Sequence, residues 1–352
     1  MGLVLLFGGE RMEKFDVAII GAGVVGGMLA RELSRYALSV CLLEAENDVA
    51  CGATKANSGI IHGGFDPEPG TLKAKLNAEG IGLLYEAAEA LHVPYRKNGS
   101  LVCAFTQEEA ALLQALHRRG IENGAPETVI LTGDEARRLE PALSEKVTAA
   151  LHAPEAGIIC PYSLTIAAVG NAMDNGVALR RNFRVCAVSR EEDGFAVTAE
   201  NGRCVSARFL VNCAGAYADR VAAMAGDDSF RIIPRAGEYL LLEKECGDLV
   251  KSTVFQVPTR AGKGILVSPT AHGNLLLGPT AAEVDSPEGK DTTAAGLETV
   301  RKLSAKSVPS VDPRRVITAF TGVRASTAGG DFIIRPSGDA PGLLHAAAIS
   351  GY

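Results

Sequence analysis

The chain has 352 residues, which is enough to bury a substantial core and predicts two domains. Its 39 glycines and its hydrophobic content of 47% are typical of an α/β enzyme and exclude a disordered or fibrous protein. The net charge of −6, with no run of Lys or Arg, argues against nucleic acid as a partner, although a local basic pocket is compatible with it.

The eight cysteines are scattered without a C-x-x-C pair. We therefore expect free thiols in a reducing compartment, which indicates the cytoplasm, and no metal or iron–sulfur site within this sequence. No apolar run approaches the ~18 residues of a membrane span, and attachment to a membrane surface stays open. Residues 1–7 lack the basic region of a signal peptide, and we expect translation to start at Met12.

The first motif lies in residues 16–44, a pattern of short apolar strand, glycine turn, helix and second strand that ends in an acid. Gly21 permits the tight turn, Gly23 lets the backbone approach a pyrophosphate, and Gly26 lets the helix pack on the strand. Glu44 follows at close to the ~20-residue spacing of a carboxylate that binds ribose hydroxyls. Because the helix N-terminus also favours phosphate, these features predict a bound dinucleotide cofactor.

The later elements change in character along the chain. Helices are predicted over residues 71–90, 107–119, 134–140, 161–175, 217–225 and 292–306. Strands are predicted over residues 100–105, 177–181, 184–189, 195–200, 208–213, 239–243, 253–257, 264–268 and 275–278. The run of strands between 231 and 279 indicates a second, antiparallel sheet. The predicted fold class is therefore α/β, with a Rossmann-like, doubly wound domain interleaved with an antiparallel-sheet domain of α+β type.

Three further motifs follow the glycine turn. One covers residues 53–64 (Ala-Thr-Lys-Ala-Asn-Ser-Gly-Ile-Ile-His-Gly-Gly) and continues through 69–74, and another is Val-Asn-Cys-Ala-Gly-Ala-Tyr-Ala-Asp at 211–219. The last combines Gly-Val-Arg-Ala at 322–325 with Gly-Asp-Phe-Ile-Ile at 330–334. In this order the four motifs resemble the D-amino-acid-oxidase superfamily of FAD-dependent oxidoreductases, in its glycerol-3-phosphate dehydrogenase and L-2-hydroxyglutarate dehydrogenase branch.

This resemblance implies FAD as the cofactor. In the family, the 53–64 loop runs along the isoalloxazine, and the backbone at 213–215 lies where pyrophosphate or ribose approaches, although tight sheet packing would also explain small residues there. Beyond the glycine turn and Glu44, the residues expected to contact FAD are Thr54, Asn57, Ser58, Val185, Cys213, Ala214 and Gly215. Some relatives tether FAD through a histidine, but the matching position is Ala56, so a non-covalent flavin is expected.

The resemblance also implies which residues act on the substrate. His62 is the histidine of the flavin loop and is expected to be the catalytic base; the alternative is a histidine that binds loop backbone. Arg324 is expected to clamp a substrate anion in two-point geometry, the alternative being a surface arginine. If residues 235–239 are extended as a strand, Arg235 and Tyr239 share one face and are assigned to the same site, whereas Glu238 points away and is expected to be structural.

A further pair of cations, Arg260 and Lys263, could bind a substrate phosphate or form a solvated hairpin tip. Under the resemblance, the FAD-binding domain is predicted at residues 12–75, 148–228 and 321–352, and the substrate domain at 76–147 and 229–320. Relatives continue into a helix that binds the flavin pyrimidine, so we expect this sequence, which stops at Tyr352, to lack that helix.

The expected function is hydride transfer from a small anionic hydroxy compound to flavin N5, with glycerol 3-phosphate as the first candidate substrate. L-2-hydroxyglutarate is the second, because residues 235–239 resemble that branch, and amine oxidation is the third. The chain has one G-x-G-x-x-G, so electrons are expected to enter from an organic substrate rather than a nicotinamide nucleotide. A flavoprotein without catalysis, or a subunit that needs a partner to accept electrons, stays open.

Overall fold

The computed structural model describes residues 12–258 and 264–350, and the chain divides into two compact units. The first unit contains the residues up to Thr54, together with Thr165–Ile232 and Thr327–Ile349. The second contains Lys55–Leu164 and Ile233–Ser326. Each unit is thus assembled from separate stretches of sequence. The assignment of one to the cofactor and the other to the substrate, and the domain limits given above, stay predictions.

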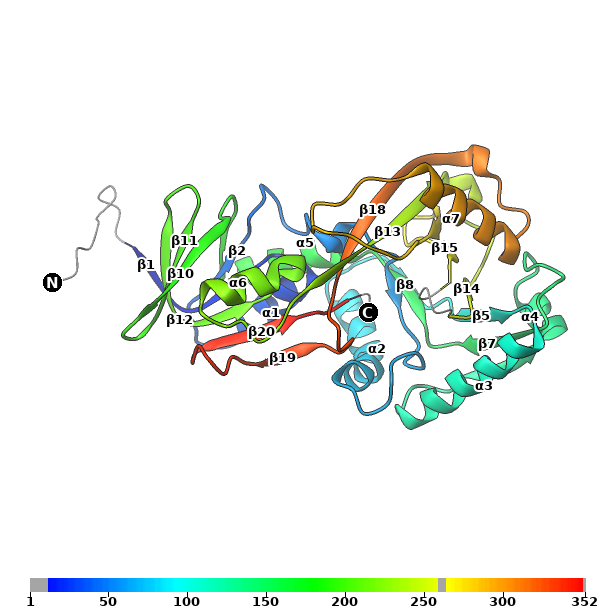
Figure 1. The fold of residues 1–352 in the computed structure, drawn as a ribbon, viewed down its shortest axis with the longest axis horizontal. Coiled ribbons are helices and arrows are strands. Elements are labelled where there is room, and N and C mark those ends of the chain that lie inside the picture. Colours follow the sequence, from blue (N-terminus) through cyan, green and yellow to red (C-terminus); the bar gives the residue numbers. More distant parts are fainter. Residues whose placement is uncertain (1–11, 259–263, 351–352) are drawn as a thin grey trace. The chain divides into compact units, whose positions relative to one another are not determined.

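An eight-stranded sheet forms the centre of the first unit (Figure 1). In spatial order its main strands are β10 (Val185–Glu191), β11 (Gly194–Ala199), β12 (Cys204–Asn212), β1 (Glu13–Ile20), β2 (Val40–Leu43) and β9 (Ala178–Arg180), while β20 (Leu343–Ala347) pairs with β12 and β19 (Ile333–Pro336). The ladder from β12 through β1 and β2 to β9 is parallel, as is the β12–β20 pair. The carboxyl ends of β1 and β12 therefore lie at one edge, with Ile20 beside Asn212.

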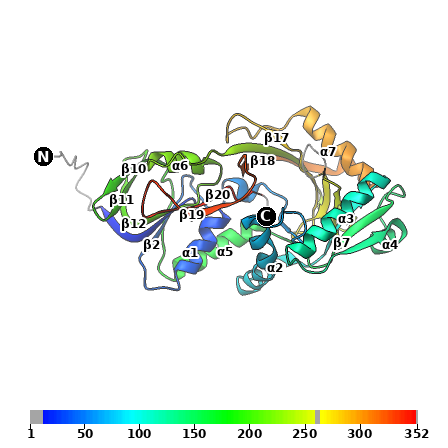
Figure 2. The ribbon, with the colours of Figure 1, turned by 60° about the horizontal axis from the view of Figure 1, so that its bottom comes forward.

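Helices cover both faces of this sheet, which explains the continuous apolar run at the end of β1. α1 (Val24–Leu33) and α5 (Pro161–Asp174), within which the unit boundary falls, lie side by side on one face (Figures 1 and 2). They pack closely because Gly27 of α1 has no side chain; a Cβ there would lie 3.0 Å from Val169 Cγ2. The other face, with Phe183, Phe195 and Leu210 at its core, carries α6 (Ala218–Met224).

The second unit contains a nine-stranded sheet. Its strands run in the order β17 (Ala282–Glu283), β13 (Ile233–Leu242), β16 (Leu275–Gly278), β15 (Leu266–Pro269), β14 (Thr253–Gln256), β5 (Ser100–Ala104), β7 (Ala149–Ala153) and β6 (Val129–Thr132), and β18 (Val316–Ser326) pairs with β13. All pairs are antiparallel except β5 with β14, which join segments far apart in the chain. A small sheet of β3 (Ile60–Ile61), β8 (Gly157–Ile159) and β4 (Tyr95–Arg96) accompanies it.

Among the described residues, four α-helices belong wholly to the second unit: α2 (Leu72–Ala90), α3 (Gln107–Glu122), α4 (Gly133–Leu139) and α7 (Ala294–Ser307). α7 covers one face of the sheet and contributes Val300 to a core with Leu240 and Leu277. α3 lies along β7 on the opposite face, where Leu113 packs with Leu151 (Figure 2). That opposite face is the one that bears the candidate site residues below.

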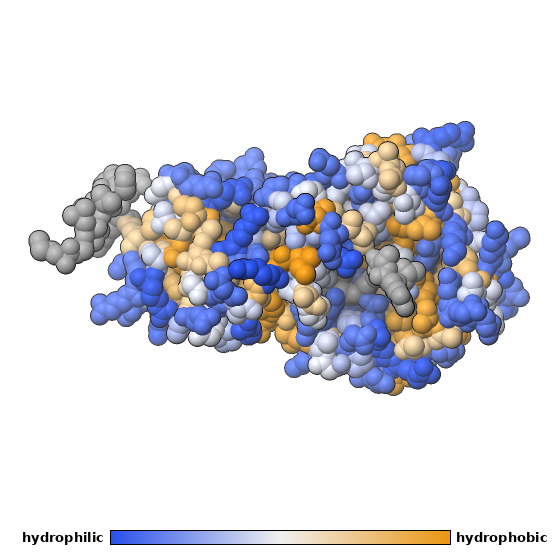
Figure 3. Space-filling view, viewed as in Figure 1, coloured by the Kyte–Doolittle hydropathy of each residue, from blue (hydrophilic) through white to orange (hydrophobic). Residues whose placement is uncertain are grey.

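In the described part of the chain, no helix has the length and hydrophobicity needed to cross a membrane. The face seen in Figure 3 interleaves hydrophilic side chains with smaller apolar areas. No cluster of three or more His, Cys, Asp or Glu side chains suited to a metal ion occurs among the described residues either.

Candidate functional site

The glycine turn of the first unit is built by close backbone packing. Gly21 has φ +105°, and a Cβ at this position would lie 2.5 Å from the carbonyl oxygen of Cys213. A Cβ on Gly26 would lie 2.0 Å from the carbonyl oxygen of Gly21. Neither position therefore accepts a side chain without displacement of the backbone, which matches the roles predicted for both glycines.

The start of α1 offers its backbone N–H groups to an anion. Gly23 is the N-cap residue and has no side chain of its own to cap the helix, and the first turn of α1 has no acidic residue. Val24 N–H donates to Thr54 Oγ1 at 3.0 Å, so the predicted flavin contact Thr54 belongs to this turn in the first unit. A dinucleotide pyrophosphate fits these features, because the helix dipole favours negative charge and no carboxylate occupies the position.

Glu44 directly follows β2 and is 8% exposed. Its Oε2 accepts the N–H of Ala22 at 2.9 Å and its Oε1 accepts the N–H of Glu46 at 2.9 Å, so the carboxylate braces the glycine turn. Burial is the largest influence and raises the pKa of Glu44 above its usual value, against these backbone hydrogen bonds. A carboxylate has lone pairs beyond the two in use, which leaves acceptor capacity for ribose hydroxyls.

The segment Cys213–Gly215 follows β12 and lies against the glycine turn through the contact at Gly21. Burial raises the pKa of the Cys213 thiol to about 12, so this side chain is a neutral packing group and the backbone is the part suited to a ligand. Val185 starts β10 and packs on the core that contains Ile20 and Phe183; no described contact joins it to the glycine turn.

In the second unit, the loop after Thr54 has a defined shape. Asn57 Oδ1 accepts the N–H of Gly59 at 2.8 Å. Gly59 has φ +62°, and a Cβ there would lie 2.4 Å from the carbonyl oxygen of Ile159, so β3 can join β8 directly after it. Ser58 Oγ lies 3.2 Å from Tyr239 Oη, which attaches the loop to β13.

β13 and β18 bring the two predicted arginines together. Their register places Arg235 opposite Arg324, and two rungs away Gly237 lies opposite Gly322. A Cβ on Gly237 would lie 2.8 Å from a terminal nitrogen of Arg324, so this guanidinium extends across Gly237. Within the described residues neither arginine has an ion-pair partner, and the buried Nε of Arg235 has no hydrogen-bond acceptor.

Two rungs further along the same ladder, Tyr239 lies opposite Phe320, and the two rings stack with their centroids 4.8 Å apart. The strand registers continue this row of cross-strand neighbours from Tyr239 across β16 to Leu266 on β15 and then to Phe255 on β14. His62, which follows β3, lies with its ring 6.2 Å from that of Phe255. The loop from Ser58 to His62 therefore crosses the sheet face that carries both arginines.

Glu238 points to the other face of β13, as strand alternation predicts. Its Oε2 accepts the N–H of Thr293 at 2.8 Å and its Oε1 accepts the Thr293 hydroxyl at 3.0 Å. Thr293 is the N-cap of α7, so the buried Glu238 carboxylate binds the positive end of that helix. Arg260 and Lys263, the further predicted substrate cations, lie outside the described residues.

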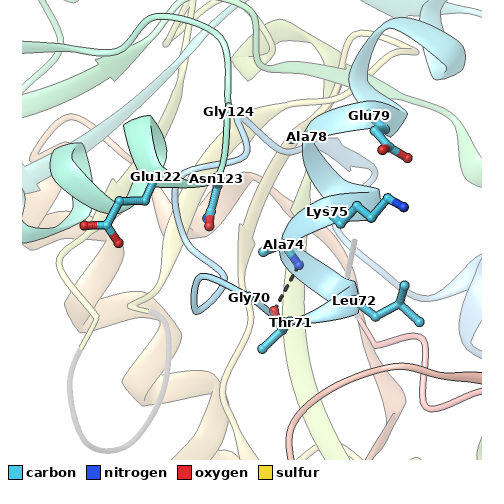
Figure 4. A pocket seen from close by; sticks show the side chains of 10 residues that line it. All are labelled: Gly70, Thr71, Leu72, Ala74, Lys75, Ala78, Glu79, Glu122, Asn123 and Gly124. Atoms are coloured by element: carbon cyan, nitrogen blue, oxygen red, sulfur yellow. Dashed lines mark hydrogen bonds between the residues drawn. The ribbon is translucent and has the colours of Figure 1, made fainter.

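A hollow of ≈ 620 Å³ lies between the start of α2 and the end of α3 (Figure 4). Thr71 caps α2 by accepting the Ala74 N–H at 3.1 Å, and Lys75 and Glu122 give the walls opposite charges. The lining contains the end of the second motif but none of the predicted site residues. It is therefore not our candidate for the reaction.

Some structural features of the two units were not predicted from the sequence. Gly237 leaves room on β13 for the Arg324 guanidinium. Gly322 lets the loop after Thr54 approach β18, since a Cβ there would lie 1.8 Å from the carbonyl oxygen of Ala56. Asn212 and His345 form a buried polar contact in the first unit. A histidine inside the apolar strand Leu-Leu-His-Ala-Ala was the available signal for that contact.

Comparison with known proteins gives consistent matches over almost the whole chain. Residues 16–352 match the family described as FAD dependent oxidoreductase (DAO). Glycerol 3-phosphate dehydrogenase of Caloramator mitchellensis is 44% identical over 335 residues, covering 95% of this chain and 70% of that protein. Human mitochondrial L-2-hydroxyglutarate dehydrogenase is 33% identical over 303 residues, covering 81% of this chain and 65% of that protein.

Among solved structures, the dithionite-reduced L-α-glycerophosphate oxidase of Mycoplasma pneumoniae, with FAD bound, is similar in fold. It superposes with a TM-score of 0.91 at 32% identity, and the match covers 96% of this chain and 90% of that one.

Proposed function

The chain belongs to the DAO family of FAD-dependent oxidoreductases, and from this premise we propose that it oxidises sn-glycerol 3-phosphate. FAD is its cofactor and, when bound, accepts a hydride from the substrate carbon. The first unit is proposed to hold FAD, through the glycine turn, the start of α1 and Glu44. The second is proposed to bind the substrate.

The observation that carries the proposal is the opposition of Arg235 and Arg324 without a carboxylate partner among the described residues. Two guanidiniums on one sheet face repel each other unless an anion lies between or above them. A phosphate dianion offers enough oxygens to accept from both in two-point geometry. Similarity to the 44% identical glycerol 3-phosphate dehydrogenase supports the same choice.

The remaining residues of that face receive roles by their chemistry. His62 is proposed to accept the hydroxyl proton of the substrate, because an imidazole is a base near neutral pH. Tyr239 and Ser58, joined at 3.2 Å, are proposed to orient the substrate and the flavin-facing loop. Asn57, Ser58 and, from the first unit, Thr54 are proposed flavin contacts. The methyl side chain of Ala56 has no nucleophilic atom that could bond to the flavin, so FAD is proposed to be held non-covalently.

L-2-hydroxyglutarate is the second candidate substrate. The two opposed arginines would also suit its two carboxylates, one on each guanidinium. The Arg-Ala-Gly-Glu-Tyr segment at 235–239 and the 33% identity to the human L-2-hydroxyglutarate dehydrogenase support this alternative. An amine substrate ranks third, since a cation would be repelled by the same pair.

Anaerobic mixing of the FAD-loaded protein with each candidate tests the proposal. Glycerol 3-phosphate is expected to bleach the flavin absorbance, and L-2-hydroxyglutarate and glycine are expected to leave it unchanged. Bleaching by L-2-hydroxyglutarate alone would transfer the assignment to the second candidate. FAD-loaded protein that no candidate reduces, even with artificial acceptors present, would contradict catalysis and favour a binding role.

A further inference from the structure

A chain of buried polar groups lies beneath the carboxyl end of β12 in the first unit. Asn212 is 0% exposed, His345 and Asp227 are each 1% exposed, and Ser337 is 7% exposed. Asn212 and His345 are register partners on β12 and β20, so their side chains share one face of the sheet. Polar groups this deeply buried persist only when they are hydrogen-bonded.

Backbone groups fix the orientation of the Asn212 amide. Its Oδ1 accepts the N–H of Ala214 at 3.2 Å, and its Nδ2 donates to the carbonyl oxygen of Ala218 at 2.7 Å. Since backbone groups cannot exchange donor and acceptor roles, Nδ2 is also the atom that faces His345 Nδ1, at 3.4 Å. Nδ1 must therefore be the acceptor, and the ring proton lies on Nε2.

The Asp227 carboxylate accepts a hydrogen bond from His345 Nε2 and so keeps the ring proton on that nitrogen. Its Oδ2 lies 3.0 Å from His345 Nε2, and its Oδ1 accepts the N–H of Ser229 at 2.9 Å. Burial would raise the pKa of the Asp227 carboxyl, but hydrogen bonds from Ser229, Ser337 and His345 outweigh it and hold the pKa well below its usual range. The ionised Asp227 thus selects the imidazole tautomer that accepts from Asn212.

The segment controlled by this network is the turn after β12. Asn212 binds both ends of it, at Ala214 and at Ala218, and so sets the path of Cys213–Gly215. The carbonyl of Cys213 in turn packs on Gly21 of the glycine turn. In open α/β sheets ligands bind at the carboxyl ends of the strands, and β1 and β12 end together here.

We propose that Asn212 is a positioning residue for the adenosine-diphosphate part of FAD, and that His345 and Asp227 hold it in place. The inference rests on the proposed assignment of Cys213–Gly215 to the cofactor. It does not depend on the substrate, because its test uses apoprotein and nucleotides alone. A failure of the substrate assignment would therefore leave it intact.

The test compares nucleotide affinity with stability in matched variants. Asn212→Ala and His345→Leu remove the network, whereas Leu343→Ala opens a cavity two residues from His345 on the same strand. Calorimetric titration of each apoprotein with FAD and with ADP gives the affinities, and chemical denaturation gives the stability. Both network variants are expected to bind FAD and ADP about 10-fold more weakly, as for an unsatisfied buried group.

Leu343→Ala is expected to lower the denaturation midpoint at least as much as the network variants do, while its ADP affinity stays within about 2-fold of the wild-type value. His345→Gln keeps a donor and an acceptor, so it is expected to recover part of the nucleotide affinity that His345→Leu loses. It also keeps the test decisive if His345→Leu does not fold. Equal loss of ADP affinity in Leu343→Ala, or unchanged affinity in Asn212→Ala, would overturn the proposal.

Discussion

Arg235 and Arg324 lie directly opposite each other across the β13–β18 ladder, two half-buried guanidiniums on one sheet face. On its other side, Arg235 lies opposite Glu283 of the neighbouring strand β17, yet no ion pair joins these two side chains. Like charges directly opposite in a sheet are destabilising, so the apoprotein carries a cost that the proposed anionic substrate would relieve. This cost is the physical reason to expect that anionic substrate and protein stability are coupled at this face.

The first prediction concerns the geometry of that pair. Arg324→Lys keeps the charge but loses the planar two-point donor, and we expect substrate binding to weaken by about 2–5 kcal/mol, as for a reshaped desolvated pair. FAD content should not change. Stopped-flow flavin reduction across substrate concentration measures the apparent affinity and the limiting rate separately.

Arg235→Lys and the double variant complete the cycle. If both guanidiniums bind one anion, the losses in the two single variants are expected to be non-additive in the double variant. Strict additivity would mean that the arginines bind different groups. Unchanged substrate affinity and rate in Arg324→Lys would show that this arginine is structural and that the active-site assignment is wrong.

The second prediction separates proton transfer from binding. His62→Ala should slow substrate-dependent flavin reduction by ~10²–10⁴-fold, the range for loss of a general base, with a smaller change in substrate affinity. His272→Ala, which removes an exposed histidine in a turn, is the control. A full reduction rate in His62→Ala would leave His62 with the alternative role of binding loop backbone.

The third prediction compares two glycines. Gly322→Ala would place a Cβ 1.8 Å from the carbonyl oxygen of Ala56, so we expect a loss of about 1–3 kcal/mol in stability, as for overpacking. Gly82→Ala on the exposed side of α2 meets nothing within 4 Å and should stabilise by about 0.5–1 kcal/mol. Thermal unfolding of both variants measures the difference. Equal midpoints would mean that the loop at Ala56 moves freely away from β18.

Family, cofactor class and the presence of two sheet types could be predicted from the sequence, and all three are confirmed. A dinucleotide cofactor was predictable locally, because the glycine turn, the second strand and Glu44 lie in order within one short segment. The family and FAD itself were implied by the resemblance that all four motifs carry together. The helices at 71–90 and 107–119 were equally accessible, because Thr71 and Thr106 cap them just before their helical patterns begin.

Long-range pairing was not accessible in this way. β13 begins at Ile233 rather than near 239, because its first half is stabilised by β18 from the far end of the chain. The opposition of Arg235 and Arg324 depends on that register, which no local pattern encodes. The same holds for the contact between Asn212 and His345, residues brought together by the β12–β20 pair.

The last prediction uses the double role of Glu44. Glu44→Gln leaves one acceptor oxygen in place of two, so one of the N–H groups of Ala22 and Glu46 becomes unsatisfied. We expect the apoprotein to lose about 1–3 kcal/mol, the cost of an unpaired buried donor, and FAD affinity to fall as well. Denaturation of apoprotein and FAD titration measure the two effects.

This loss should depend on pH with a definite sign. Since burial raises the folded-state pKa of Glu44 above 4.5, the protonated carboxyl contributes stability that is fully present below pH 4.5. That contribution is lost as the pH rises through the folded-state pKa. Glutamine does not titrate, so the difference in free energy of unfolding between wild type and Glu44→Gln should shrink over this window. The free energy of unfolding, measured for both apoproteins in steps from pH 4.5 to 8, tests the sign. A difference that grows with pH would mean that hydrogen bonds from Ala22 and Glu46 outweigh burial and that the glycine turn prefers the ionised carboxylate.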